Sequence, residues 1–269
     1  MNILGYATNM YGWTERWKLD GRPQPHSWDV LLRECAESGL DAVEIDASPE
    51  KLALARKYGL TVSASYLGLQ IHEPFDVLNY EKEISPFAER LAAAGGKHLL
   101  LNADPWGSWT RPIPKKEEHF IRQGDNLSKI AHLVAPMGLA VSLHNHAADR
   151  YNAEGDLNSV VRYSDPAVGL CVDTAWASAA GCDPVAWIRS YPERIHYFHL
   201  RNQNGRLPKE DLLEGSINFQ ELIAAVKEIG YEGWLSLELW HPQEIEPVRS
   251  MIEDVTRSTQ YLRELIQKA

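Results

Sequence analysis

Residues 27–46 read SWDVLLRECAESGLDAVEID, and this stretch contains the pattern that decides the fold. Its apolar residues first recur at helical spacing, over Ser27–Ser38. Gly39 then ends the helix, because glycine readily adopts the left-handed conformation found after helix C-termini. Ala42–Asp46 follows as a mostly apolar run typical of a strand. The stretch therefore predicts one helix followed by one strand.

The same order of helix, glycine and strand recurs along the chain. Ser48 and Pro49 begin the next helix, since serine caps helix N-termini well and proline suits the first helical position. Expected strands number eight, at Ile3–Asn9, Ala42–Asp46, Thr61–Tyr66, His98–Asn102, Leu139–His146, Val168–Asp173, Ile195–Leu200 and Trp234–Trp240. Further helices are expected at Pro49–Tyr58, Tyr80–Ala94, Lys115–Met137 and Phe219–Ile229.

Strands that alternate with helices form parallel βαβ units. Eight such units in about 250 residues are typical of a closed (β/α)8 TIM barrel, of the α/β class. An open doubly wound sheet is the alternative, but no glycine-rich dinucleotide fingerprint follows the first strand. No linker or low-complexity segment divides the chain, so we expect a single barrel domain over residues 1–269.

The charge balance narrows the classes of partner. The chain has 27 Lys and Arg against 37 Asp and Glu, a net charge of −10. This disfavours binding to nucleic acid phosphates or anionic membranes. No apolar run approaches the ~20 residues of a membrane helix, and the N-terminus lacks a signal-peptide pattern. Three widely spaced cysteines without a CxxC motif favour a reducing compartment, so we expect a cytoplasmic protein.

Polar side chains gather at the ends of the last four expected strands, where TIM barrels carry their chemistry. These segments carry His144-Asn145-His146, Asp173, His199 and Glu238. Because side chains alternate along a strand, a common inward face would bring imidazoles and carboxylates to one point. That mixed nitrogen and oxygen set suits a divalent ion such as Mn, Zn, Co or Fe.

Each of these residues alone also has a purely structural explanation. A strand-end histidine can be a hydrogen-bonded core residue, and Asp173 can cap the next helix. Glu238, however, lies between two leucines in a strand that helices should cover, and an unpaired buried carboxylate is costly. A bound cation is the economical partner for it, which favours a metal site.

Four stretches in the second half of the chain carry a family resemblance. They are residues 169–177 (GLCVDTAWA), 194–202 (RIHYFHLRN), 215–219 (GSINF) and 230–238 (GYEGWLSLE). Together with the strand-end set they resemble the sugar isomerase/epimerase superfamily with a xylose-isomerase-like barrel. That superfamily includes ketose epimerases, hydroxypyruvate isomerases, inosose dehydratases and endonuclease IV. The resemblance covers nearly the whole chain but is a poor guide to substrate, because one fold hosts many chemistries.

The resemblance implies a single divalent metal ion, with Mn as the first expectation and Zn, Co, Fe or Mg as alternatives. The family's ligands are usually Glu, Asp, His and Glu on the last four strands, and Asp173, His199 and Glu238 match three of these positions. The first position departs from the pattern, since the common Glu is replaced by His144. We expect His144 as the first ligand, with His146 as a rival ligand or a free acid/base.

A metal that binds a carbonyl and its neighbouring hydroxyl makes the adjacent C–H acidic by stabilising an enediolate. A positioned base then removes the proton, and Glu238 and His146 are the catalytic candidates. Returning the proton gives isomerisation or epimerisation of a small sugar or keto-sugar, which we predict as the function. The alternative is a metal-dependent lyase or dehydratase acting on a keto-sugar, a keto-inositol (inosose) or a 3-keto-glycoside.

Five further side chains are candidates for contact with a small carbohydrate substrate. They are Arg201, Trp106, His72, Glu44 and Tyr6. Arg201 can hold substrate oxygens or form a salt bridge at the rim, and Trp106 can stack on a sugar ring or cover the core. Glu44 can line the pocket or brace a neighbouring cation.

Two other classes of function fit the sequence less well. A nuclease of the endonuclease IV kind is opposed by the acidic net charge and by the absence of additional His and Glu ligands. A non-catalytic sugar-binding barrel would leave the intact set of metal ligands without a role. A homo-oligomer is plausible for such a barrel, although no residue pattern identifies an interface.

Overall fold

A computed structural model describes residues 2–147, 149–242 and 245–268. Within that part of the chain, eight parallel strands close into a barrel in the order β1-β12-β9-β8-β7-β4-β3-β2. They are β1 (Asn2–Asn9), β2 (Ala42–Glu44), β3 (Thr61–Leu69), β4 (His98–Ala103), β7 (Ala140–His144), β8 (Val168–Asp173), β9 (Ile195–Leu200) and β12 (Glu232–Leu237). Each strand pairs with its neighbours in chain order, so the predicted (β/α)8 barrel is confirmed.

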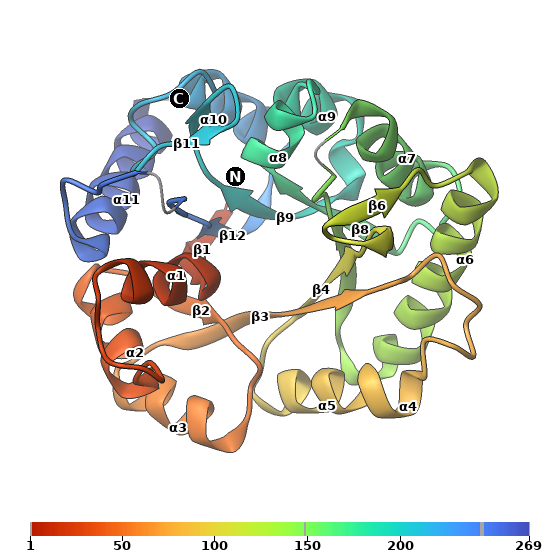
Figure 1. The fold of residues 1–269 in the computed structure, drawn as a ribbon, viewed down its shortest axis with the longest axis horizontal. Coiled ribbons are helices and arrows are strands. Elements are labelled where there is room, and N and C mark those ends of the chain that lie inside the picture. Colours follow the sequence, from red (N-terminus) through yellow and green to blue (C-terminus); the bar gives the residue numbers. More distant parts are fainter. Residues whose placement is uncertain (1, 148, 243–244, 269) are drawn as a thin grey trace.

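Helices lie around the outside of the strands (Figure 1). They are α1 (Tyr11–Leu19), α2 (Trp28–Glu37), α3 (Pro49–Lys57), α4 (Tyr80–Glu83), α5 (Ser85–Ala93), α6 (Glu117–Val134), α7 (Arg150–Val161), α8 (Thr174–Ala179), α9 (Pro184–Ser190), α10 (Phe219–Glu228) and α11 (Met251–Lys268), with 3-10 turns at Ala135–Met137 and Pro192–Arg194. No helix in the described ranges is both long enough and apolar enough to span a membrane.

The structure differs from the sequence expectations at several element boundaries. The single helix expected at Tyr80–Ala94 is two helices that meet at Ile84, because Pro86 in the first turn of α5 cannot continue a helix from α4. Strands β7 and β12 end earlier than expected, so His146 and Glu238 lie just beyond strand ends.

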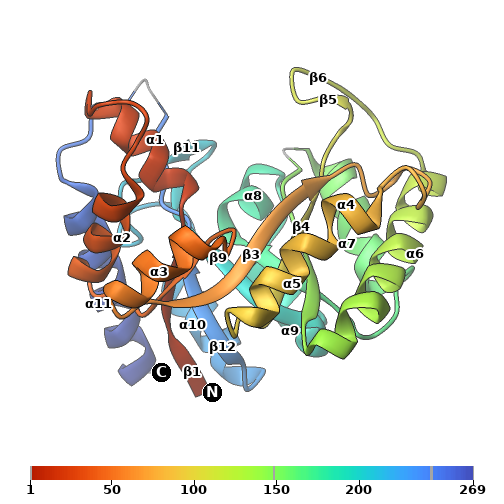
Figure 2. The ribbon, with the colours of Figure 1, turned by 90° about the horizontal axis from the view of Figure 1, so that it is seen from below.

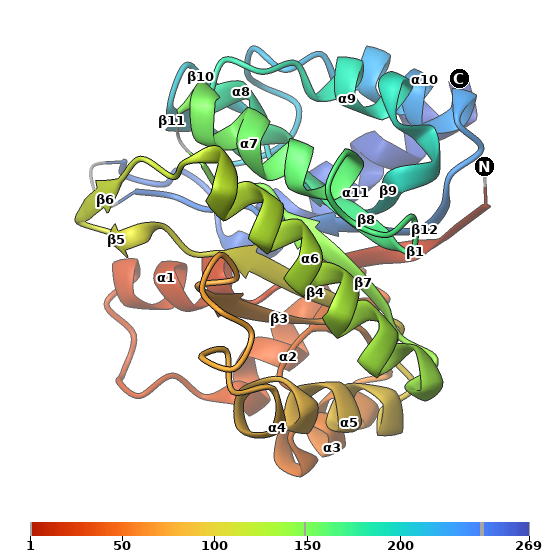
Figure 3. The same cartoon turned by 90° about the vertical axis from the view of Figure 1, so that its right-hand side faces the viewer.

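Two small hairpins were not expected from the sequence. One pairs β5 (Trp106–Ser108) with β6 (Arg111–Ile113), and the other pairs β10 (Gln203–Asn204) with β11 (Leu207–Pro208). Figures 2 and 3 show the β5–β6 hairpin at one end of the barrel, opposite the end at which both chain termini lie.

The barrel interior is closed by a small layer of buried side chains from alternate strands. This layer contains Ala64, Leu100, Cys171 and Tyr197. Side chains two residues further along the same strands point to the same face, one layer nearer the carboxyl ends. Polar side chains at those positions therefore meet above the closed layer, as the sequence pattern predicted.

Candidate active site

Four polar side chains converge above the closed layer of the barrel. His144 ends β7, Asp173 ends β8, His199 lies in β9, and Glu238 directly follows β12. One potential ligand atom from each lies within 4.8 Å of the other three. The His199 Nδ1 atom is 3.0 Å from Glu238 Oε2, and the His144 Nε2 atom is 3.6 Å from both Asp173 Oδ2 and Glu238 Oε2.

The converging atoms are buried and lack hydrogen-bond partners. Apart from the ion-pair contacts given above, no hydrogen-bond partner is present among the described residues for His144 Nε2, Asp173 Oδ2, His199 Nδ1 or Glu238 Oε2. Leaving a buried polar atom without a hydrogen bond costs about 1–3 kcal/mol, so four such atoms at one point could hold a common partner. Two imidazole nitrogens and two carboxylate oxygens fit a divalent transition-metal ion.

Side chains on other strands of the barrel orient both imidazoles toward this point. His199 places Nε2 2.9 Å from the carboxylate of Glu44, and in the neutral tautomer that donates this hydrogen bond Nδ1 would be free to ligate an ion. His144 directs Nδ1 at the amide oxygen of Asn102, 3.3 Å away, and the tautomer that donates this hydrogen bond would leave Nε2 to ligate in the same way. Such outer hydrogen bonds select the ring tautomer and raise the basicity of the ligating nitrogen.

Asp173 serves two structural purposes at once. Its Oδ1 atom accepts a hydrogen bond from the backbone N–H of Trp176 at 2.6 Å, which caps α8. Its Oδ2 atom faces the cluster without a partner. The helix-capping explanation for this residue is therefore correct, and it does not compete with a ligand role.

A cavity of about 740 Å³ opens above the cluster. This volume lies within the range of small-molecule sites, about 300–1,000 Å³. Its walls are largely aromatic, with Glu238, His146 and Arg201 among the polar lining residues. We call it the main cavity; its aromatic lining consists of Tyr11, Trp28, Tyr66, Trp109, Trp176 and Trp240.

Arg201 lines the main cavity and is nearly fully buried. Its guanidinium lies 5.6 Å from the ring centre of Trp176 and 5.8 Å from that of Trp240. Its Nη2 atom is 3.9 Å from Asp173 Oδ1. The arginine is therefore held in place by two indoles and a carboxylate, with its donors available to a bound substrate.

The family model described as "Xylose isomerase-like TIM barrel" matches residues 32–265. The chain belongs to this family. Among curated proteins, the inosose dehydratase of Geobacillus kaustophilus (strain HTA426) is 24% identical over 253 residues, which cover 82% of each chain.

Solved structures share the fold of this xylose isomerase-like barrel. An L-ribulose 3-epimerase matches with a TM-score of 0.75 and 16% identity, over 100% of this chain and 95% of that one. A D-allulose 3-epimerase from Methylomonas sp., solved with D-allulose, matches with a TM-score of 0.72 and 17% identity, over 100% and 98%.

His146 lies outside the four-atom cluster of this xylose isomerase-like barrel, in the wall of the main cavity. Its ring packs edge-on against Trp176, with 4.2 Å between centres, and against Trp109 at 4.9 Å. Burial, assisted by the charge of His144, lowers the pKa of His146 to about 3. The structure thus brings His144 rather than His146 into the cluster and leaves His146 as a neutral imidazole.

The pKa values of the two acidic members of the cluster shift in opposite directions, although burial acts on both in the same sense. Burial would raise the pKa of Glu238, but the imidazoles of His199 and His144 hold it well below its usual range. Burial raises the pKa of Asp173, against the opposing effects of Arg201 and His144. A divalent ion at this point would stabilise the charged form of both carboxylates.

The structure does not bring every predicted substrate-binding residue to the main cavity. Tyr6 faces outward in β1 and packs in the core, with the Arg263 guanidinium 4.8 Å from its ring. His72 is fully buried, and its ring packs edge-on against His119 at 5.7 Å. Trp106 lines a smaller cavity next to the main one.

Glu44 lines the main cavity, which was one of the two expected options, and its carboxylate also contacts the imidazole of His199. The sequence analysis did not identify the two residues on β3 and β4 that contact the imidazole of His144. The Tyr66 hydroxyl lies 3.4 Å from His144 Nδ1, and Asn102 orients the same ring. Both residues lie toward the carboxyl ends of their strands, so the strand-end rule applied to every strand would have identified them.

Proposed function

We propose that this protein is a divalent-metal-dependent isomerase or epimerase acting on a small sugar or keto-sugar. The observation that carries the proposal is the convergence of four buried ligand atoms without hydrogen bonds, one of them from Glu238, which also lines an aromatic-walled cavity. The residues that would hold the ion, Mn first and Zn, Co, Fe or Mg as alternatives, are His144, Asp173, His199 and Glu238. When bound, the ion would stabilise the negative charge that develops next to a carbonyl as the neighbouring carbon loses its proton.

The residues around the cluster would position the sugar. Aromatic rings such as those of Trp176 and Trp240 offer flat apolar faces to the C–H face of a sugar ring. Arg201, fixed between these two indoles, would donate hydrogen bonds to substrate oxygens. Glu238 would take the proton from carbon. The imidazole of His146, which burial keeps neutral, would hydrogen-bond a substrate oxygen in the cavity wall rather than act as a second acid/base.

A lyase or dehydratase is the second candidate, and one feature of the cluster favours it. His144 stands where the family usually has a glutamate. Glu238 is therefore the only glutamate among the four cluster residues that could act as a base. A site with one carboxylate and one imidazole suits an elimination, in which one group removes a proton and another protonates the leaving oxygen. The name inosose dehydratase on the curated relatives supports this candidate.

Product analysis in deuterated water tests the proposal and separates the two candidates. The Mn-loaded protein is incubated with a panel of ketoses, an inosose and 3-keto-glucosides, and the products are followed by NMR. Deuterium at the carbon next to the carbonyl together with a new epimer or isomer supports the first candidate. Deuterium uptake with loss of water or of an alcohol supports the second. Absence of deuterium uptake from the whole panel, with metal bound, would contradict both.

A further inference from the structure

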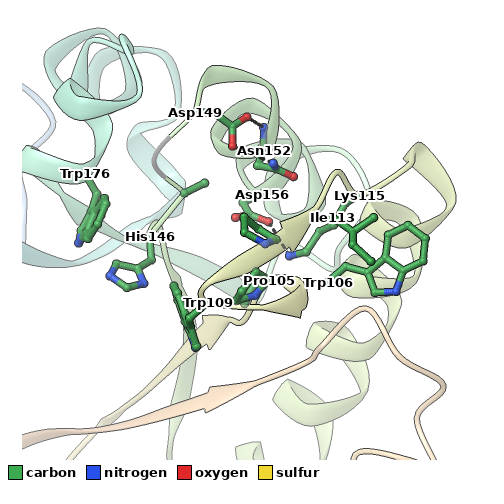
Figure 4. Close-up of a pocket in the computed structure, with 13 residues that line it drawn as sticks. Pro105, Trp106, Trp109, Ile113, Lys115, His146, Asp149, Asn152, Asp156 and Trp176 are labelled. Carbon is green, nitrogen blue, oxygen red and sulfur yellow. Dashed lines mark hydrogen bonds and ion pairs between the residues drawn. The ribbon is translucent and has the colours of Figure 1, made fainter.

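A second cavity of about 250 Å³ adjoins the main cavity (Figure 4). We call it the side cavity. It shares Trp109, His146 and Trp176 with the main cavity, and the close-up shows the two indoles on either side of His146. A molecule that occupied both cavities would therefore pass His146, whose imidazole lines both of them.

One wall of the side cavity is built by the β5–β6 hairpin. Trp106 and Ile113 pair across this hairpin and both line the cavity. Gly107 permits the close approach of the two strands, because its φ is +86° and a Cβ there would lie 2.7 Å from the Arg111 carbonyl oxygen. The hairpin departs from the barrel between β4 and α6, so it is an addition to the barrel rather than part of its closure.

The opposite wall is polar, and its charged groups already have partners within the protein, an ion pair for Lys115 and Asp156 and hydrogen bonds for Asp149. Lys115 is almost fully buried and places its ammonium 3.4 Å from Asp156. Asp149 accepts hydrogen bonds from the backbone and the side chain of Asn152, at 2.9 and 2.8 Å. An anionic ligand would find no unpaired cation among these lining residues, and the Asp149 carboxylate is exposed and occupied in capping α7. The cavity therefore suits a neutral ring with an apolar face and hydroxyl groups at its edge.

Trp109 provides an independent indication of a ligand. Its side chain stands at the tip of the hairpin, lines both cavities and is 55% exposed. An exposed indole costs hydrophobic free energy, which a ring stacked on it would recover. The indole thus offers a surface that continues from one cavity into the next.

We propose that the side cavity binds the group attached to the reacting sugar through a glycosidic oxygen. The substrate is then a keto-glycoside or a keto-disaccharide rather than a free monosaccharide or a free inosose. This inference rests on the proposed function, because it places the reacting keto-sugar in the main cavity. His146 at the junction of the two cavities lies where the linking oxygen passes.

Ile113 allows a selective test, because it lines the side cavity alone. Ile113→Trp should fill that cavity while leaving the main cavity unchanged, since Ile113 lies on the hairpin and is 46% exposed. Ile121→Trp is the matched control, because Ile121 is 42% exposed on α6 and lines neither cavity. The probes are the 3-keto derivatives of methyl β-glucoside, phenyl β-glucoside and cellobiose, with binding to Mn-loaded protein measured by titration calorimetry.

The phenyl or the cellobiose probe should bind wild type about tenfold more tightly than the methyl probe, which corresponds to about 1.4 kcal/mol. Ile113→Trp should abolish this preference without changing the affinity for the methyl probe, and Ile121→Trp should retain it. Whichever of the two larger probes binds more tightly identifies the second group as aromatic or as a sugar. Equal affinity of wild type for all three probes, or no binding of any, would overturn the proposal.

Deuterium exchange into the same probes separates this inference from the proposed function. Exchange into the methyl probe without any preference for the larger ones would refute the subsite and leave the proposed function standing. A preference for the larger probes without exchange into any of them would refute the proposed function and leave the subsite standing.

Discussion

Glu44 provides a sharp test of the metal site, because it touches a proposed ligand without belonging to the cluster. Its carboxylate is 4% exposed and accepts a hydrogen bond from His199 Nε2 at 2.9 Å. It also accepts a hydrogen bond from the hydroxyl of Ser236. Glu44→Gln keeps the size and one acceptor oxygen but removes the negative charge that supports the His199 tautomer.

The expected loss of metal affinity follows from this outer contact. Removing the hydrogen-bonding partner of a metal-bound histidine typically costs 10–100-fold in affinity, about 1.4–2.7 kcal/mol. The contact is short and buried, so water can neither replace the lost charge nor screen it. We therefore expect the Kd for Mn²⁺ or Zn²⁺ to rise by about 10–100-fold in Glu44→Gln.

The assay is competition for the metal with a chromogenic chelator, at a pH at which both proteins are folded. Glu34→Gln is the control, because it also removes a carboxylate from an ion pair. Glu34 lies on α2, pairs with Arg22 at 2.8 Å and is not part of the cluster. Circular dichroism of the metal-free proteins checks that each variant is folded. A folded Glu44→Gln variant with a Kd within twofold of wild type would refute the claim that Glu44 orients a metal ligand.

Three further outcomes are expected. Elemental analysis should find about one equivalent of Mn, Zn, Co or Fe in wild type and none in the Glu238→Gln, Asp173→Asn double variant. Metal in both proteins, or in neither protein after reconstitution, would contradict the proposed metal site. Metal at about 100 times its Kd should raise the unfolding free energy by about 2.7 kcal/mol. The Tm measured by calorimetry should therefore fall several degrees when EDTA removes the metal. An unchanged Tm would argue against a metal site formed by the folded barrel. Burial lowers the pKa of His98 to about 4, so the unfolded chain takes up this proton near pH 6.5 while the folded chain does not. The free energy of unfolding should therefore fall as the pH drops from about 6.5 to about 4, by up to about 3 kcal/mol from this residue. Urea unfolding of His98→Gln should show a smaller fall over this pH range than wild type. An equal fall in both proteins would exclude His98 as a source.

Local patterns were sufficient to predict the barrel and its strand-end polar residues. The run from Ser27 to Asp46 contains a helix period, a terminating glycine and a strand, and each depends on residues close together in the chain. The same holds for Val168–Asp173 and Ile195–Leu200, whose observed bounds equal the predicted ones. Alternation along such strands places Asp173 and His199 on the inner face, and the register indeed sets them side by side.

Contacts between distant parts of the chain were decided only by the tertiary structure. Glu44 and His199 are separated by 155 positions, and their hydrogen bond exists because closure of the barrel brings β2 across from β9. The same closure sets Tyr66 beside His144 and turns Tyr6 outward to Arg263. The side cavity likewise depends on how the β5–β6 hairpin folds over the barrel end. A periodic pattern specifies which face of its own element a residue occupies, whereas the partner across the barrel depends on register and closure, which no local pattern encodes.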